Sequence, residues 1–275
     1  MKNSQEFGSQ TSVAGRKRRL AVYAAGLLIL TGLVSVLSIF KAPLENREPP
    51  AIVMRIDDIQ DFSFQEAQLF LLNASMINEV PLSIAVIPGC FGRDREVVQT
   101  VKLAVSLGSE IVDHGWQHED FAKLSLSEQV ILLRQSKSRI KEILDYNVKV
   151  FAPPMFSFND DTIAAMEEED YSIISTCTNF DEPGLLSKVL NLPVTIKLSD
   201  FSGGVWEMKN FDMVKGEISR SIQKYGFAII VTHPQEFVTG GKLNQANVKL
   251  YQTLIRYLKE NYSLKTLEKV GEDYL

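Results

Sequence analysis

Residues 51–58 read AIVMRIDD, a largely apolar run with β-branched residues that ends in two adjacent carboxylates, Asp57 and Asp58. Short apolar runs of this kind are typical of strands that are buried on both faces of a sheet. Six further runs follow along the chain. We therefore predict seven strands, at Ala51–Ile56, Leu82–Ile87, Glu110–Val112, Val148–Phe151, Tyr171–Ser175, Val194–Leu198 and Phe227–Val231.

Longer stretches with helical periodicity lie between most of these strands. Ser125 to Glu128 form a capping-box pattern that opens a helix ending near Asp145, and Asn159 is suited to cap another helix. Strands that alternate with helices imply parallel pairing through helical crossovers. The expected fold is α/β, a distorted (β/α) barrel of about seven parallel strands, with an open doubly wound sheet as the alternative. Further helices are expected at Phe64–Asn78, Asp94–Leu107, Phe211–Tyr225 and Asn244–Asn261.

The first 50 residues differ in composition from the rest. Four cations, Arg16 to Arg19, precede an uncharged apolar stretch, Leu20 to Phe40. A helix of that length spans roughly 30 Å, the hydrocarbon core of a bilayer, and basic residues before it favour a cytoplasmic N-terminus. We predict a cytoplasmic segment 1–19, a single transmembrane anchor 20–40, a linker 41–50 and one extracytoplasmic domain 51–275.

The alternative for this N-terminal segment is a cleaved signal peptide and a secreted protein. The apolar run is longer than the usual signal core, and Lys41 to Leu44 make a poor cleavage site. The anchor at the cytoplasmic membrane is therefore the preferred interpretation.

Composition limits the partners and leaves two questions open. The formal net charge of −5 argues against binding to nucleic acid. Cys90 and Cys177 could form a disulfide in an exported protein, or could equally be unpaired small apolar residues. Nothing in the sequence indicates the oligomeric state.

Polar side chains gather where the predicted strands end. Asp57 and Asp58 close the first strand, His114 and His118 follow the third, and His233 follows the last. These three histidines are all that the chain contains. Because sites in parallel barrels and sheets form at the carboxyl ends of the strands, we expect these side chains to meet.

The spacing of His114 and His118 predicts a metal site. Residues four apart on a helical turn share one face, so both imidazoles could bind one ion. An H-x-x-x-H motif or an Asp-Asp pair alone is weak, because such residues more often lie on the surface or cap a helix. Two histidines and one carboxylate together form a ligand set that leaves open positions on a catalytic zinc, and the second carboxylate could act as a base.

The order of these motifs resembles the NodB-homology polysaccharide deacetylases, carbohydrate esterase family 4. The resemblance rests on Ile56-Asp57-Asp58, His114 to His118, Phe151-Ala152-Pro153-Pro154 and Val231-Thr232-His233. It implies a distorted barrel of about seven strands and a metal-dependent hydrolase that removes N-acetyl groups from amino sugars of an extracellular glycan.

The resemblance also implies roles for single residues. Asp58, His114 and His118 would bind a divalent metal, most readily zinc, Asp57 would be the general base and His233 the general acid. The loop of Pro154 and Met155 would help to hold the oxyanion through a backbone N–H. Trp116 and Trp206 carry flat apolar faces that could stack on sugar rings.

Several positions depart from the family pattern and indicate a divergent branch. Ala152 stands where the family has an arginine that orients the base, and no clear Asp-Trp motif is present, although Asp181 or the segment 202–206 could replace it. Loss of that arginine would suit a non-catalytic, membrane-anchored glycan-binding protein. Retention of Asp57 and His233 favours an enzyme, and a hydrolase of another amide or ester bond is a further alternative.

Overall fold

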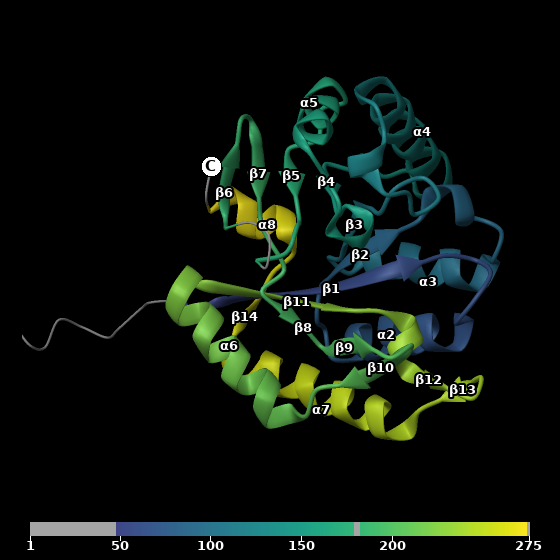
Figure 1. Ribbon diagram of the computed structural model, residues 1–275. Helices are drawn as coiled ribbons and strands as arrows, with labels where there is room; N and C mark the ends of the chain where they lie inside the picture. The colour runs from purple at the N-terminus through teal and green to yellow at the C-terminus, as the bar shows by residue number, and fades with distance from the viewer. Residues whose placement is uncertain (1–47, 179–181, 274–275) are drawn as a thin grey trace, which may run out of the picture. The chain divides into compact units, whose positions relative to one another are not determined.

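A parallel β-sheet forms the centre of the domain in this computed structural model, which describes residues 48–178 and 182–273 (Figure 1). The strand order is β6-β7-β5-β4-β3-β2-β1-β11-β8, with β14 also paired to β1. All neighbours are parallel except β6 and β7. The strands are β1 (Ala51–Ile59), β2 (Leu82–Val86), β3 (Glu110–Asp113), β4 (Val150–Phe151), β5 (Ile173–Ile174), β6 (Gly184–Leu186), β7 (Val189–Asn191), β8 (Ile196–Lys197), β11 (Phe227–Thr232) and β14 (Ser263–Leu264).

All seven predicted strands are present, although β4, β5 and β8 are shorter than expected. The strands that the sequence did not predict are short and lie mostly in hairpins. Two of these hairpins stand outside the main sheet. They are β9 (Ser199–Ser202) with β10 (Val205–Met208), and β12 (Val238–Thr239) with β13 (Lys242–Leu243).

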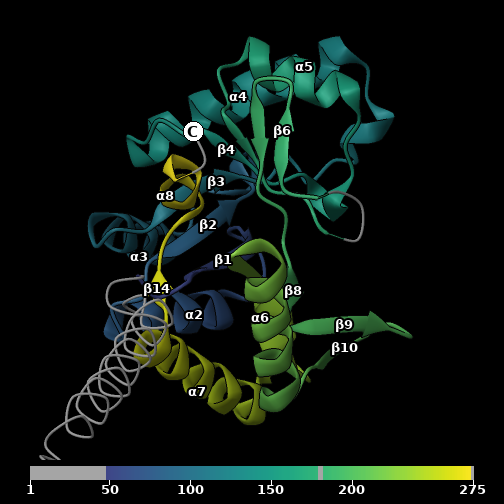
Figure 2. The same ribbon diagram turned by 90° about the vertical axis from the view of Figure 1, so that its left-hand side faces the viewer.

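The sheet is curled into a half-barrel (Figure 2). Strands β7 and β8 lie in one continuous segment, whose first half pairs with β5 and whose second half pairs with β11. The Thr178 amide donates to the Val194 carbonyl on one side, and the Thr195 amide donates to the Ile229 carbonyl on the other. This segment therefore bridges the two ends of the curled sheet.

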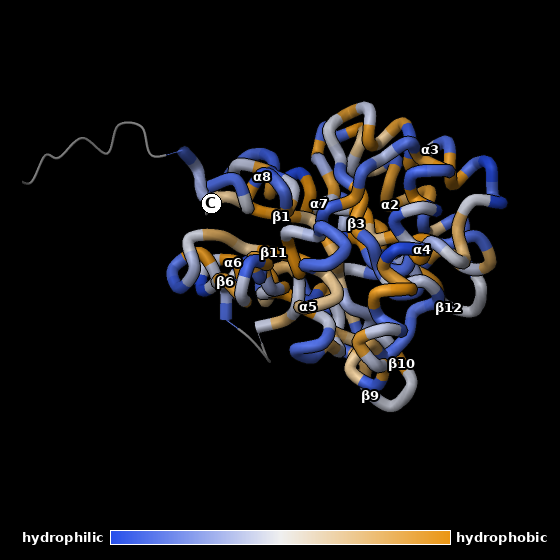
Figure 3. Tube along the Cα trace, turned by 90° about the horizontal axis from the view of Figure 1, so that it is seen from above, coloured by the Kyte–Doolittle hydropathy of each residue, from blue (hydrophilic) through white to orange (hydrophobic). Residues whose placement is uncertain are grey.

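Most of the helices cover the outer face of the sheet, and apolar side chains fill the space between them and the strands, whereas Leu267 and Val270 of the last helix join the cluster inside the curl. Leu71, Val101, Leu133, Ile218 and Leu254, each from a different helix, share one buried cluster with strand residues. A second apolar cluster fills the inside of the curl, and the apolar parts of the chain run through the interior in Figure 3. The α-helices are α2 (Gln65–Ile77), α3 (Arg95–Ser106), α4 (Leu126–Leu144), α5 (Asp160–Glu168), α6 (Phe211–Tyr225), α7 (Gln245–Asn261) and α8 (Leu267–Glu272).

The predicted helix starts are confirmed by their caps. Ser125 and Glu128 form the capping box of α4, and the Asn159 side chain accepts the Thr162 amide at the start of α5. The polar side chains that begin these helices satisfy N–H groups that would otherwise lack partners.

The two faces of β1 determine which of its side chains enter the curl. Ile52, Met54 and Ile56 belong to the outer cluster and Val53 to the inner one. Because side chains alternate along a strand, Arg55 and Asp57 point inward. The register with β2 then shifts between Ile56 and Ile59. Asp58 lies within this irregularity at a φ of 61°, which turns it away from the regular alternation.

The predicted cytoplasmic segment and the anchor at Leu20–Phe40 lie outside the described residues, as does most of the linker. Among the helices of the described part, none is both long enough and apolar enough to span a membrane. Cys90 and Cys177 are free cysteines, which answers the question of a disulfide between them.

Candidate active site

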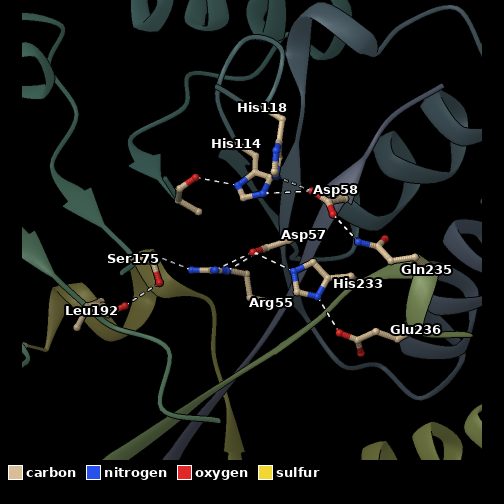
Figure 4. A network of polar contacts seen from close by, with 11 residues as sticks. Arg55, Asp57, Asp58, His114, His118, Ser175, Leu192, His233, Gln235 and Glu236 are labelled. Carbon is tan, nitrogen blue, oxygen red and sulfur yellow. Dashed lines mark hydrogen bonds and ion pairs between the residues drawn. The ribbon is translucent and has the colours of Figure 1, made fainter. Parts of the chain in front are cut away.

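Asp58, His114 and His118 come together at the carboxyl ends of β1 and β3 (Figure 4). The Asp58 Oδ1 atom lies 3.3 Å from Nε2 of His114 and 3.4 Å from Nε2 of His118. This Oδ1 is buried and has no hydrogen-bond partner among the described residues. A buried carboxylate oxygen without a donor is costly, so its position between two imidazole nitrogens is that of a ligand to a cation.

The ligand distances fit a divalent metal ion. Ligand atoms about 2.0–2.1 Å from a tetrahedral zinc lie about 3.3–3.4 Å from one another, which agrees with both measured separations. His114 Nδ1 lies 2.8 Å from the Ala152 carbonyl. Because a carbonyl can only accept, Nδ1 carries the proton and Nε2 presents its lone pair to the site. Asp58 Oδ2 is held by the Gln235 amide at 2.7 Å.

The expected helical turn between the two histidines is wrong. Residues 114–120 form a loop, in which Gly115 has a φ of 73° and His118 a φ of 68°. These two left-handed residues reverse the chain, so that both rings reach Asp58 from a loop. A Cβ at position 115 would lie only 2.9 Å from the Pro154 side chain, so glycine is required both by its conformation and by the available space.

Asp57 forms an ion pair with Arg55, a residue that was not predicted to belong to the site. Arg55 donates from Nε to Asp57 Oδ1 at 2.8 Å and from Nη2 to Oδ2 at 2.7 Å, and its Nη1 donates to the Ser175 carbonyl at 2.8 Å. Both side chains are buried. Burial alone would raise the pKa of Asp57, but the charge and hydrogen bonds of Arg55 hold it below its usual value. Asp57 is therefore kept ionised and fixed in orientation.

His233 faces Asp57 from the end of β11. Its Nε2 lies 4.0 Å from Asp57 Oδ2, and its Nδ1 donates to Glu236 Oε1 at 2.7 Å. Glu236 is buried and also accepts the Thr232 hydroxyl at 2.5 Å. Burial opposes protonation, but the hydrogen bond and charge of Glu236, together with Asp57 and Asp58, raise the pKa of His233 above its usual value.

A cavity of about 480 Å³ opens over these groups. Its far wall is the β9–β10 hairpin, which contributes Phe201 and Trp206. The Trp206 ring lies 5.3 Å from the His233 ring and 4.9 Å from the Phe201 ring. A larger cavity of about 860 Å³ adjoins it and shares Met155 and Phe156 as lining residues. The site therefore combines ionisable groups with aromatic surfaces.

The residues predicted to contact substrate are not all brought together. Met155 lines both cavities, and it and Phe156 have φ values of 55° and 57°. Pro154 is buried against Gly115, and its neighbour Pro153 lines the cavity instead. Trp116 packs over Gly89 and is not among the residues that line the cavity. Asp181 lies outside the described residues.

Three residues of the site were not predicted from the sequence: Arg55, Gln235 and Glu236. Arg55 was visible as a charge inside an apolar run, two positions before Asp57 and hence on the same face of the strand. Glu236 stands three residues after His233, a spacing that one turn brings into contact. No sequence pattern indicated that Gln235 belongs to the site.

The chain is similar to a known family of proteins. A family model described as polysaccharide deacetylase matches residues 47–174, the part that contains Asp57, Asp58, His114 and His118. No curated protein matches the chain. The predicted resemblance to the NodB-homology polysaccharide deacetylases is confirmed by this match and by the structural neighbours.

Three solved structures illustrate the shared fold. A candidate polysaccharide deacetylase from Mycobacterium smegmatis has a TM-score of 0.65 at 15% identity, covering 82% of this chain and 91% of its own. The Xyl-CE4 domain of a xylanase from the hindgut metagenome of Trinervitermes trinervoides has a TM-score of 0.57 at 18% identity, covering 83% and 92%. The Bacillus anthracis protein BA3943, a CE4 family pseudoenzyme, has a TM-score of 0.52 at 17% identity, covering 82% and 66%.

Proposed function

We propose that this chain is a metal-dependent deacetylase that hydrolyses the N-acetyl group of amino sugars in an extracellular glycan, anchored to the cytoplasmic membrane by residues 20–40. The observation that carries the proposal is the unpartnered Asp58 Oδ1 between two imidazole nitrogens, beside the Asp57 carboxylate fixed by Arg55 and the His233 ring held by Glu236. The polysaccharide deacetylase family match supports the reaction class.

Asp58, His114 and His118 would hold the metal, and we propose zinc. A divalent cation held there would polarise the amide carbonyl and lower the pKa of water toward neutrality. Asp57 is the proposed general base, since Arg55 keeps it ionised and aimed into the cavity. Three protein ligands leave coordination positions open for water and substrate.

His233 is the proposed general acid. An amine leaves poorly until it is protonated, and His233 presents Nε2 to the cavity while Glu236 holds Nδ1. Its raised pKa keeps the ring protonated at higher pH. A pure glycan-binding module requires neither this acid nor the base.

The direct test is release of acetate by the full-length protein loaded with zinc, measured on N-acetylated oligosaccharides of several kinds. We expect release by the wild type, and a loss on the order of 1,000-fold in Asp57→Asn, which removes the base but leaves the three ligands in place. Bound zinc without acetate release from any glycan would instead indicate a binding protein or another substrate.

Glu236→Gln is expected to shift the alkaline limb of the pH–rate profile. The neutral amide still accepts the Nδ1 proton of His233 but carries no charge, so the pKa of His233 falls. Loss of an adjacent carboxylate typically lowers a histidine pKa by about one unit or more. Because the acid must be protonated to act, activity should decline from a lower pH than in the wild type. An unmoved limb would show that His233 does not donate the proton.

A further inference from the structure

The wall of the catalytic cavity formed by β8 and β9 presents two hydrogen-bond donors that the proposed mechanism does not use. Ile196 and Leu198 belong to the outer apolar cluster. Because side chains alternate along an extended chain, Lys197 and Ser199 face the other way. Both line the cavity with Asp57, Asp58 and His233.

Neither donor is satisfied by the described part of the protein. The Ser199 residue is 1% exposed, and its hydroxyl has no hydrogen-bond partner there. Lys197 makes no ion pair with any described carboxylate; its ammonium lies 4.8 Å from the centre of the Phe156 ring, which orients it over an apolar surface. Buried polar groups normally have partners, so the free Ser199 hydroxyl, beside a partly exposed Lys197 ammonium that has no ion-pair partner in the described structure, indicates a ligand that supplies the acceptor.

The charges around Lys197 indicate that the acceptor on the ligand is an anion. Asp57 is already paired with Arg55, and Asp58 is itself one of the three proposed metal ligands. Asp200 also lines the cavity but is exposed and forms no ion pair with Lys197 within the described structure. Lys197 is therefore a positive charge on the cavity wall that no carboxylate of the described structure pairs with.

We propose that Lys197 and Ser199 bind an acidic group, a carboxylate or phosphate, on the sugar that is deacetylated or on its neighbour. This deepens the proposed function and rests on it: the substrate is an acidic rather than a neutral N-acetylated glycan. An ammonium and a hydroxyl can donate together to one anion, and hydrogen bonds to a charged group are the stronger ones.

The test compares binding of matched probes to the zinc-loaded full-length protein by calorimetry. One pair is a tetrasaccharide of alternating N-acetylglucosamine and glucuronic acid, and its methyl ester. The other pair is N-acetylglucosamine 6-phosphate and N-acetylglucosamine. We expect the wild type to prefer one acidic probe over its neutral partner by about tenfold or more, and the pair that shows the preference identifies the acidic group.

In Lys197→Met, the acidic probe and its neutral partner should bind almost equally well. Lys197→Arg should retain most of the preference for the acidic probe, and Ser199→Ala should reduce that preference in part. The control is Lys141→Met, an exposed lysine on α4 that pairs with Asp145, which should keep the full preference. A wild type without preference, or an unchanged preference in Lys197→Met, would overturn the proposal. Because binding is measured, a protein that binds acidic probes but releases no acetate refutes the deacetylase reaction alone.

Discussion

Asp58→Ala is expected to abolish zinc binding and to lower acetate release on the order of 1,000-fold, equivalent to about 4 kcal/mol of lost transition-state stabilisation. Asp58 contributes the only carboxylate of the proposed ligand group, and its Oδ1 lies between both imidazoles. Without it, two neutral histidines would hold the cation alone. Metal content after dialysis and the rate with saturating zinc are the two measurements.

The matched control for this variant is Asp61→Ala, which removes a nearby carboxylate that accepts the Arg93 and Asp94 amides instead of facing the histidines. Asp61→Ala should keep its zinc. If Asp58→Ala also retained stoichiometric zinc, the assignment of this residue as a ligand would be refuted.

Arg55→Met should lower both stability and activity. It leaves Asp57 buried without its partner, and breaking a buried ion pair by removing one member costs about 3–5 kcal/mol. The pKa of Asp57 should then rise, because burial remains while the largest opposing charge is gone. The acidic limb of the pH–rate profile therefore moves to higher pH, since the base must be ionised to act. Urea unfolding and the pH–rate profile measure the two effects.

A double variant separates these two effects. Arg55→Met with Asp57→Asn removes the buried charge as well, so much of the lost stability should return while activity stays low. Arg55→Lys keeps a charge but cannot form two parallel hydrogen bonds, and an intermediate result is expected. Unfolding free energies that are equal in the wild type and Arg55→Met would contradict the structural role of this pair.

The strand framework and the main site residues were predictable because their signals are local. A buried parallel strand is a run of apolar residues, and the three histidines all follow such runs. The hairpin β9–β10 was not predicted, because exposed residues such as Phe201 and Val205 alternate without forming a buried run. Gly203 and Gly204 form its turn, with φ values of 60° and 84°.

The pairing of Asp57 could not be predicted from the family pattern. The arginine expected at position 152 is an alanine, whose carbonyl instead accepts the proton of His114. Arg55 supplies the guanidinium from the strand itself, so the missing residue no longer argues against catalysis. The side chains at positions 55 and 57 share one face of β1 inside the curl, and this shared position allows the pairing.

The position of β1 also constrains how the chain must be synthesised and folded. Ala51 pairs with Phe227, so one side of the first strand stays open until nearly all of the domain has been made. Until then it exposes an apolar edge, which is prone to pair with other chains. Contacts so distant in sequence also slow folding. His233 follows β11 directly, so the arrival of this late strand both covers the exposed edge and completes the proposed catalytic site.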